Sequence, residues 1–154
     1  MRYFLSQFKM LSSSVISSVL EKINYSNVEN ITNLVSGTKI TTIPTIMRDN
    51  LHVKNMTSIF SSCKSLTDIS SFSEIDISQV TSFSGLFSGC ESLTDISSFS
   101  EIDTSQVTSF SSLFAGCKTL TNLSPLTNCN TSKVTDMYNL FGGRNNLKMN
   151  INNI

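Results

Sequence analysis

An internal repeat limits the fold of this chain more than any other feature of its sequence. Residues 64–87 and 91–114 differ at only three positions, and one constant offset relates every residue of the first segment to its equivalent in the second. Weaker copies extend the pattern in both directions, and their anchoring valines are Val28, Val53, Val80, Val107 and Val134. Stacked copies of such a unit bury a continuous core, so the sequence predicts a solenoid of about five repeats of 25–27 residues.

Within each copy, two apolar patterns predict the secondary structure. The residues Val80, Phe83, Leu86 and Phe87 are spaced by three, three and one, which is typical of one helical face. This pattern predicts a short helix of about two to three turns per repeat, closed by a glycine C-cap. A following pair, such as Leu93 and Ile96, predicts one short parallel strand per repeat, stacked about 4.8 Å from the next.

Residues 1–23 differ from the repeats. Apolar residues at Phe4, Phe8, Leu11, Val15 and Val19 predict an amphipathic helix over residues 3–23. We interpret residues 1–23 as a capping helix for the first coil and residues 24–154 as the solenoid, within a single domain. An anchor or partner helix is the alternative interpretation.

The segment IDTSQVTSFSSLFAGCKTLTNL, residues 102–123, and its copies resemble the BspA-like leucine-rich repeats of bacterial, mycoplasmal, protist and phage proteins. The family unit reads roughly D-T-S-x-V-T-x-M-x-x-M-F-x-x-C-x-x-L-x-x-L, and residues 131–137 match it most closely. The resemblance covers about residues 24–150. It implies an α/β solenoid, coiled in the right-handed sense of leucine-rich repeats and used for adhesion or protein binding.

Several large and small apolar residues recur at equivalent positions, which predicts that they form the core. Phe72 and Phe99 are assigned to the core rather than to an exposed aromatic platform. Cys63, Cys90 and Cys117 share one repeat position and predict an inward ladder of reduced thiols, and Cys129 is a further core filler. A disulfide between neighbouring coils and a metal site are the alternatives for the cysteine ladder.

Catalysis needs unlike groups that converge at one place, whereas this chain shows the same residues in every repeat. No CxxC pair occurs and the only histidine is His52, so we expect no metal and no cofactor. The carboxylate pairs Glu74/Asp76 and Glu101/Asp103 could mimic a glycosidase site, but turn caps explain them better. We therefore expect no catalytic residues and a protein that is not an enzyme.

Composition also limits the partners. The net charge is zero and charged residues make up 14% of the chain, so we expect no nucleic-acid partner. No apolar run is long enough to span a membrane, and we expect no membrane insertion. The N-terminal residues show no signal-peptide pattern, which favours a cytoplasmic or virion-associated location over classical secretion.

Two surfaces are candidates for binding. On the concave face of a leucine-rich repeat, polar residues between the inward leucines could contact a protein partner of unknown identity; a solvated sheet is the alternative. These residues are Thr67, Asp68, Ser70, Thr94, Asp95, Ser97, Thr121, Asn122 and Ser124. The rival hypothesis is a structural or decoration component of a larger assembly, such as a phage virion. It would make contacts through the ends of the solenoid, including self-association through residues 147–154.

Overall fold

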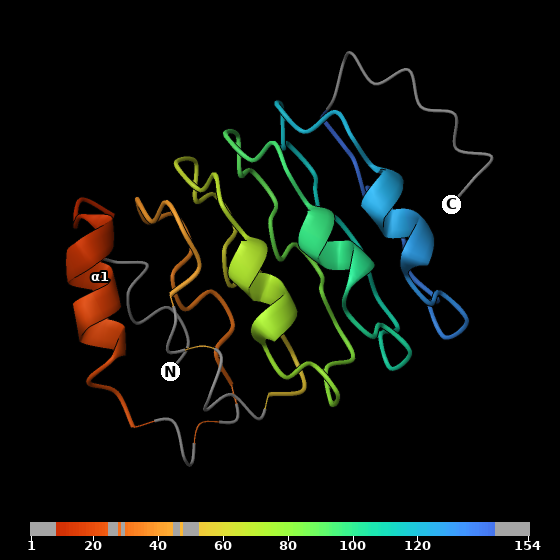
Figure 1. The fold of residues 1–154 in the computed structure, drawn as a ribbon, viewed down its shortest axis with the longest axis horizontal. Helices are drawn as coiled ribbons and strands as arrows, with labels where there is room; N and C mark the ends of the chain where they lie inside the picture. The colour runs from red at the N-terminus through yellow and green to blue at the C-terminus, as the bar shows by residue number, and fades with distance from the viewer. Residues whose placement is uncertain (1–8, 25–27, 29, 45–46, 48–52, 144–154) are drawn as a thin grey trace.

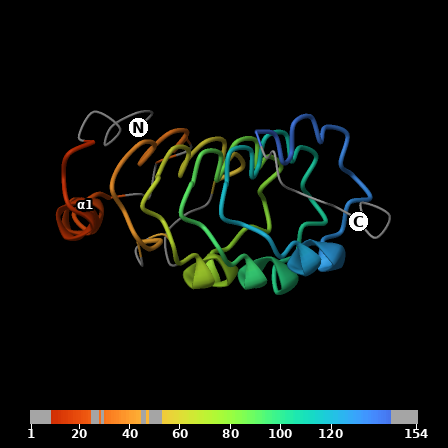
Figure 2. The ribbon, with the colours of Figure 1, turned by 90° about the horizontal axis from the view of Figure 1, so that it is seen from above.

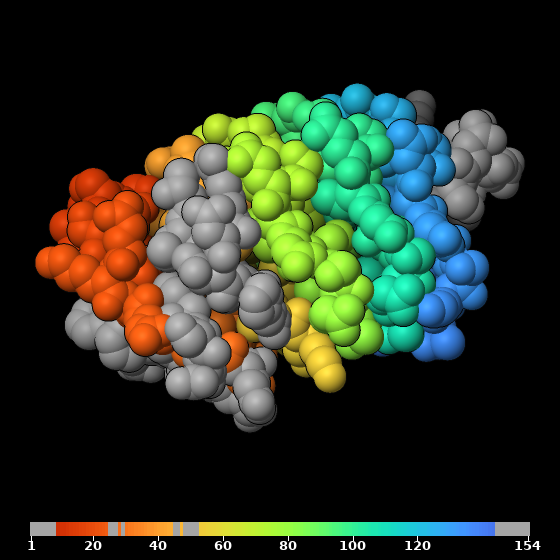
Figure 3. Space-filling view, turned by 60° about the horizontal axis from the view of Figure 1, so that its bottom comes forward, coloured from red at the N-terminus to blue at the C-terminus, as the bar shows by residue number. Residues whose placement is uncertain are grey.

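The repeats fold into a row of stacked coils, which is a repeat solenoid (Figure 1). The computed structural model describes residues 9–24, 28, 30–44, 47 and 53–143. Seen from above in Figure 2, the coils follow one another along a single axis, and short helices line one edge. Figure 3 shows that successive coils also lie in sequence order on the molecular surface.

Neighbouring coils are joined by backbone hydrogen bonds at the segment that follows the repeat valine. The N–H groups of Phe83, Gly85, Phe87 and Gly89 each donate to a carbonyl of the following coil, at 2.6–3.0 Å. Equivalent bonds join residues 110–116 to residues 136–142, at 2.7–3.0 Å. Parallel bridges lie beside these bonds and link Asn55 to Ser82, Ser82 to Ser109, and Ser109 to Asp136. We call residues 83–89 and their equivalents in the other coils the ladder edge.

The predicted repeat helix is wrong at these residues, because the ladder edge is a series of turns. Leu86, Ser88 and Cys90 donate their N–H groups to carbonyls three residues earlier, whereas the N–H groups between them donate to the next coil. A chain of three-residue turns has nearly the same spacing of buried side chains as a helix. The apolar pattern therefore predicted the buried face correctly, with Phe83, Leu86 and Phe87 all in the core, but the wrong backbone.

Two positions of the ladder edge hold a left-handed backbone in each coil. One contains Ser58, Gly85 and Ser112 at φ of 55–62°. The other contains Ser62, Gly89 and Gly116 at φ of 58–72°. The repeat glycine predicted as a helix C-cap thus lets the chain reverse inside a turn, where a side chain would be strained.

A second edge, which we call the helix edge, carries three 3-10 helices that lie side by side in Figure 1. They are η2 (Ser70–Glu74), η3 (Ser97–Ser100) and η4 (Ser124–Asn128). The predicted strand per repeat is wrong here. Within the described residues of this part of the coils, Thr42 to Asp68 is the single parallel bridge between two coils, and Ser12 to Lys39 joins the start of the N-terminal helix to the first coil. The polar residue before each helix bonds the local backbone instead, which competes with pairing between coils.

The helix α1 (Ser13–Leu20) lies at the N-terminal end of the row (Figure 1). The Ser12 side chain accepts a hydrogen bond from the Val15 N–H, and Ser12 also forms a parallel bridge with Lys39 of the first coil. Ile16 and Leu20 are buried in the core. The predicted helix over residues 3–23 is therefore shorter within the described residues, and residues 1–8 lie outside them. The division at residue 23 stays a prediction.

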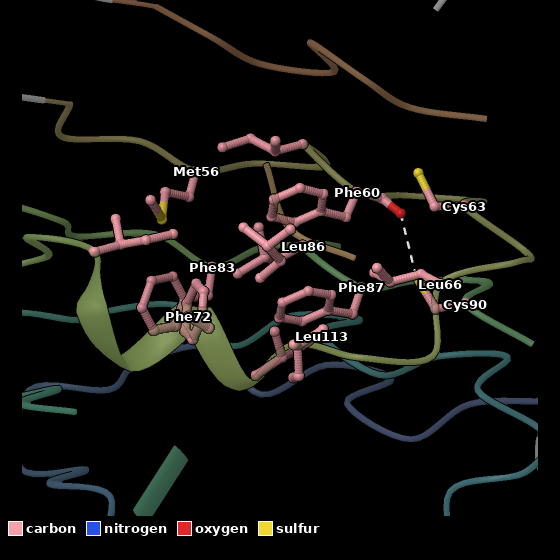
Figure 4. Packing of buried hydrophobic residues seen from close by; sticks show 14 of the residues in the cluster. Met56, Phe60, Cys63, Leu66, Phe72, Phe83, Leu86, Phe87, Cys90 and Leu113 are labelled. Atoms are coloured by element: carbon pink, nitrogen blue, oxygen red, sulfur yellow. Dashed lines mark hydrogen bonds between the residues drawn. The ribbon is translucent and has the colours of Figure 1, made fainter. Parts of the chain in front are cut away.

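Equivalent phenyl rings stack from coil to coil through the core. Phe60 lies face to face with Phe87 (Figure 4), with ring centroids 5.4 Å apart, and Phe87 and Phe114 are 5.9 Å apart. Phe72 and Phe99 form a second stack at 5.2 Å, which confirms their assignment to the core. Because each ring repeats with its coil, the core extends along the axis instead of forming one central cluster.

The cysteine ladder is buried as predicted, and its three residues form no disulfide in the part of the chain that the structure describes. Cys63, Cys90 and Cys117 donate their S–H groups to carbonyls of the preceding coil at 3.1–3.2 Å. Burial raises the pKa of the Cys63 thiol to about 11, and this effect outweighs the lowering of the pKa by hydrogen bonds with Thr38. Burial also raises the pKa of the Cys90 thiol. The half-buried Cys129 packs against the same core. These thiols therefore act as small apolar fillers with one satisfied donor each.

Candidate functional site

The structure brings all nine predicted binding residues to the surface on three successive coils. We call this set the polar row: Thr67, Asp68, Ser70, Thr94, Asp95, Ser97, Thr121, Asn122 and Ser124, each of which is exposed. The residues lie before and at the start of the three 3-10 helices of the helix edge, and neighbouring helices contact each other. The backbone that carries the polar row is consequently a set of capped turns, and the continuous sheet that the sequence predicted is not found there.

The acidic or amide residue in each coil is held by the turn that follows it. Asp68 Oδ1 accepts a hydrogen bond from the Ser70 N–H at 2.8 Å, and Asp95 Oδ1 accepts one from the Ser97 N–H at the same distance. Asn122 Oδ1 accepts the Ser124 N–H at 3.0 Å. These Asx turns fix three polar head groups at equivalent places in successive coils. Hydrogen bonds from Ser70 lower the pKa of the Asp68 carboxyl, with the larger effect from the backbone N–H and the smaller from the hydroxyl.

A pocket of about 220 Å³ lies between the first two of these turns. Its lining includes five residues of the polar row: Thr67, Asp68, Ser70, Asp95 and Ser97. The remaining four members, Thr94, Thr121, Asn122 and Ser124, are not among the residues that line it. The pocket therefore combines two carboxylates from adjacent coils with several hydroxyl groups.

Ser98 also lines this pocket, and sequence reasoning missed it. The residue is only 4% exposed, and its hydroxyl oxygen, which exposes less than 1 Å² to solvent, has no hydrogen-bond partner among the described residues. Buried hydroxyl groups in folded proteins nearly always have a partner. The equivalent residues of the neighbouring coils are Ser71 and Pro125. Comparing the copies could have flagged position 98, because Pro125 shows that the fold does not need a hydroxyl there.

The other carboxylate pairs behave as the sequence indicated. Asp76 Oδ1 accepts the Ser78 N–H at 3.0 Å, and Asp103 Oδ1 accepts the Ser105 N–H at 2.9 Å. The Ser105 N–H, followed by its hydroxyl, lowers the pKa of Asp103. Both aspartates are therefore turn caps. Among the described residues, no three His, Cys, Asp or Glu side chains form a group that could hold a metal ion, and His52 lies outside them.

The last described coil presents a second, apolar feature. Met137 is 42% exposed and Tyr138 is 77% exposed, whereas Phe110 at the position equivalent to Met137 is buried. A small cavity of about 20 Å³ beside them is lined by residues that include Leu126, Cys129 and Leu140. Residues 147–154, the predicted contact segment, lie outside the described residues. In the part of the chain that the structure describes, no helix is long and apolar enough to cross a lipid bilayer.

These observations define a repeat solenoid with a row of exposed polar residues, and comparison with known proteins places it in a family. The family model described as "Mycoplasma protein of unknown function, DUF285" matches residues 4–100 and 94–154. The chain belongs to this family, which confirms the predicted resemblance to BspA-like leucine-rich repeats. The comparison with curated proteins found no match.

A solved structure has a similar fold. It is a leucine-rich repeat protein from Eubacterium ventriosum, which matches with a TM-score of 0.50 and 20% sequence identity. The match covers 77% of this chain and 28% of the solved protein, so this chain spans only a small part of that protein's length. At this identity the likeness supports the leucine-rich-repeat fold alone.

Proposed function

We propose that this chain is a non-enzymatic module that binds a protein through the polar row. The observation that carries this proposal is the alignment of the nine exposed residues on three successive coils. Each coil contributes a polar head group that its own turn already fixes, so a partner would order little of this surface on binding. Adhesion to a cell surface is the form of binding that the family resemblance suggests.

A protein partner fits this surface better than nucleic acid. The net charge of the chain is zero, and the polar row contains two carboxylates and no cation. Phosphate groups would be repelled by such a face. An extended protein surface could instead donate hydrogen bonds to several coils at once, and the affinity would be built from evenly spaced contacts.

The binding face can be tested by charge reversal. The double variant Asp68→Lys/Asp95→Lys should lose the protein that the immobilised chain captures from an extract of its source cells. The matched control is Asp76→Lys/Asp103→Lys, because these aspartates also cap turns but lie outside the polar row. Loss in the first variant and retention in the control are expected. Equal capture by all three chains would rule out the polar row as the binding face.

A second candidate function is that of a structural component in a larger assembly, such as a virion. The exposed Met137 and Tyr138 on the last described coil favour it, since apolar side chains at the end of a stack can pack against a neighbour. Light scattering should then give a defined multiple of the 17.0 kDa chain mass. Met137→Lys/Tyr138→Lys should return the mass to one chain, whereas Ser78→Lys should not. A single-chain mass for the unmodified protein at all concentrations would exclude this self-association.

A further inference from the structure

We propose that the pocket between Asp68 and Asp95 receives the guanidinium group of an arginine side chain from the partner protein. This inference deepens the proposed function and rests on it for the identity of the partner as a protein. Two independent features carry it: the charge of the pocket lining, and the buried Ser98 hydroxyl that has no hydrogen-bond partner among the described residues.

The charge of the lining selects a cation. Among the described residues that line the pocket, Asp68 and Asp95 are the only ionisable ones, and they stand on adjacent coils. A carboxylate offers about four lone-pair sites on its two oxygens. The side chain of Asp95 accepts two hydrogen bonds from Ser97, one from its N–H at 2.8 Å and one from its hydroxyl at 3.1 Å, so acceptor capacity remains. A cation in the pocket would contact two negative groups whose positions the turns have already set.

The Ser98 hydroxyl supplies the second observation. A polar atom that is buried without a partner is unfavourable, and such atoms in folded proteins usually mark a missing water, ion or ligand. The coil itself does not require this hydroxyl, because Pro125 takes the equivalent position in η4. This oxygen exposes less than 1 Å² to solvent, so a ligand N–H would reach and satisfy it only after the wall of the pocket at η3 opens slightly. The pocket would then offer acceptors at both walls and at Ser98.

The shape and chemistry of these acceptors favour guanidinium over other cations. A guanidinium group is planar and carries five N–H donors in a fixed fork, so it can bond to acceptors on two walls at once. The volume of about 220 Å³ is large enough for such a head group. A metal ion is a poorer fit, because the lining offers only two carboxylates and the described residues form no larger ligand group. Stacked coils therefore create a two-sided acceptor site that neither coil has alone.

The direct test is an NMR titration of the full chain with N-acetyl-arginine amide. Saturable shifts are expected at the backbone amides of Ser70, Ser97 and Ser98. The neutral analogue N-acetyl-citrulline amide should leave them unchanged, and N-acetyl-lysine amide should bind more weakly. Absence of saturable shifts with the arginine probe would overturn the proposal, as would equal binding of the lysine or citrulline probe. Stronger shifts with calcium chloride would replace it with a metal site.

Two variants assign the binding to the pocket. Asp95→Asn removes a charge but can keep the turn, since Asn122 forms the same turn in the next coil. It should weaken arginine-probe binding by about tenfold or more, as expected when a charge-assisted hydrogen bond is lost. Asp103→Asn is the matched control, because Asp103 caps a similar turn outside the pocket, and it should bind as the parent does. Equal weakening in both variants would contradict the assignment.

Ser98→Ala tests the second feature separately. The variant should fold normally and bind the arginine probe severalfold more weakly than the parent; parent-like affinity would remove Ser98 from the site.

The pocket and the binding face can also fail independently. If the arginine probe does not bind but Asp68→Lys/Asp95→Lys still abolishes partner capture, the pocket proposal is wrong and the binding face stands.

Discussion

The two edges of the coil satisfy their backbone groups in opposite ways. On the ladder edge, every second N–H donates to the next coil, as Phe83 and Phe87 do. On the helix edge, the N–H groups of Ser70 and Ser97 bond within their own coil, to the aspartates before them. The Thr67 and Asp68 N–H groups of this edge do donate to another coil, at Thr41. The ladder edge must therefore keep its register in every repeat, whereas the helix edge can change one coil at a time. Pro125 and Asn122 in η4 and the turn before it are such local changes.

The largest expected effect comes from breaking the ring stack beneath the ladder edge. Phe87→Ala removes a fully buried ring that stacks on both Phe60 and Phe114. The free energy of unfolding should fall by roughly 3–5 kcal/mol. Tyr138→Ala is the control, because Tyr138 is 77% exposed and the loss of its ring should change stability by less than about 0.5 kcal/mol. Urea unfolding measures both, and equal stability of the two variants would contradict the core assignment.

A smaller effect is expected at the left-handed positions of the ladder edge. Gly116 has φ of 72°, and an added Cβ would lie 3.4 Å from the Gly89 Cα. Gly116→Ala should therefore destabilise the fold by about 1–2 kcal/mol. Ser62 occupies the equivalent position at φ of 58°, so Ser62→Gly should relieve strain and raise the melting temperature. A shift of both variants in the same direction would show that backbone strain is not the cause.

On the helix edge, the loss of one turn cap should have a moderate cost. Asp95→Ala removes the acceptor of the Ser97 N–H and should lower the free energy of unfolding by about 1 kcal/mol. Asp95→Asn can keep this bond and should remain close to the parent in stability. The comparison separates the structural role of the side chain from its charge. Thermal unfolding of the two variants measures it, and equal destabilisation by Ala and Asn would argue against the cap.

The smallest effect concerns a surface ion pair between coils. Glu91 lies 2.7 Å from Lys64 and 2.8 Å from Lys118, and hydrogen bonds from Lys118 and then Lys64 lower its pKa to about 2. Because the folded pKa is below the usual value, the stabilisation is present near neutral pH and is lost as the pH falls from about 4.5 to 2. Glu91→Gln should flatten the stability profile in this window, measured by urea unfolding at each pH. High salt should reduce the difference between the two proteins.

The repeat made much of the fold predictable from the sequence. Equivalent positions such as Phe72 and Phe99, or Cys63 and Cys90, had to share one environment, and all four are buried. The backbone was less predictable, because turns closed every three residues place side chains on one side much as a helix does. The Asx turns of Asp68 and Asp95 likewise replaced a predicted strand. Local hydrogen bonds of this kind have little effect on the spacing of apolar residues, so the apolar pattern of the sequence hardly reveals them.

The candidate site was predictable in part. All nine residues of the polar row are exposed, as their positions between buried leucines implied. The pocket was not predictable, because it lies between two coils and depends on how far apart their turns stand. Ser98 was missed for a related reason: serine is abundant in this chain, and the burial of this one is visible only in the structure, although Pro125 at the equivalent position was a signal in the sequence.

The hydrogen bonds of the ladder edge have a consequence for the length of such proteins. Each coil offers its neighbour the same donors in the same register, so a whole repeat can be inserted or removed without a new interface being required. The length of the molecule would then change in fixed steps. The pocket lies between the Asp68 and Asp95 turns, so duplication of these two coils would add a second such pocket at a spacing that the repeat sets.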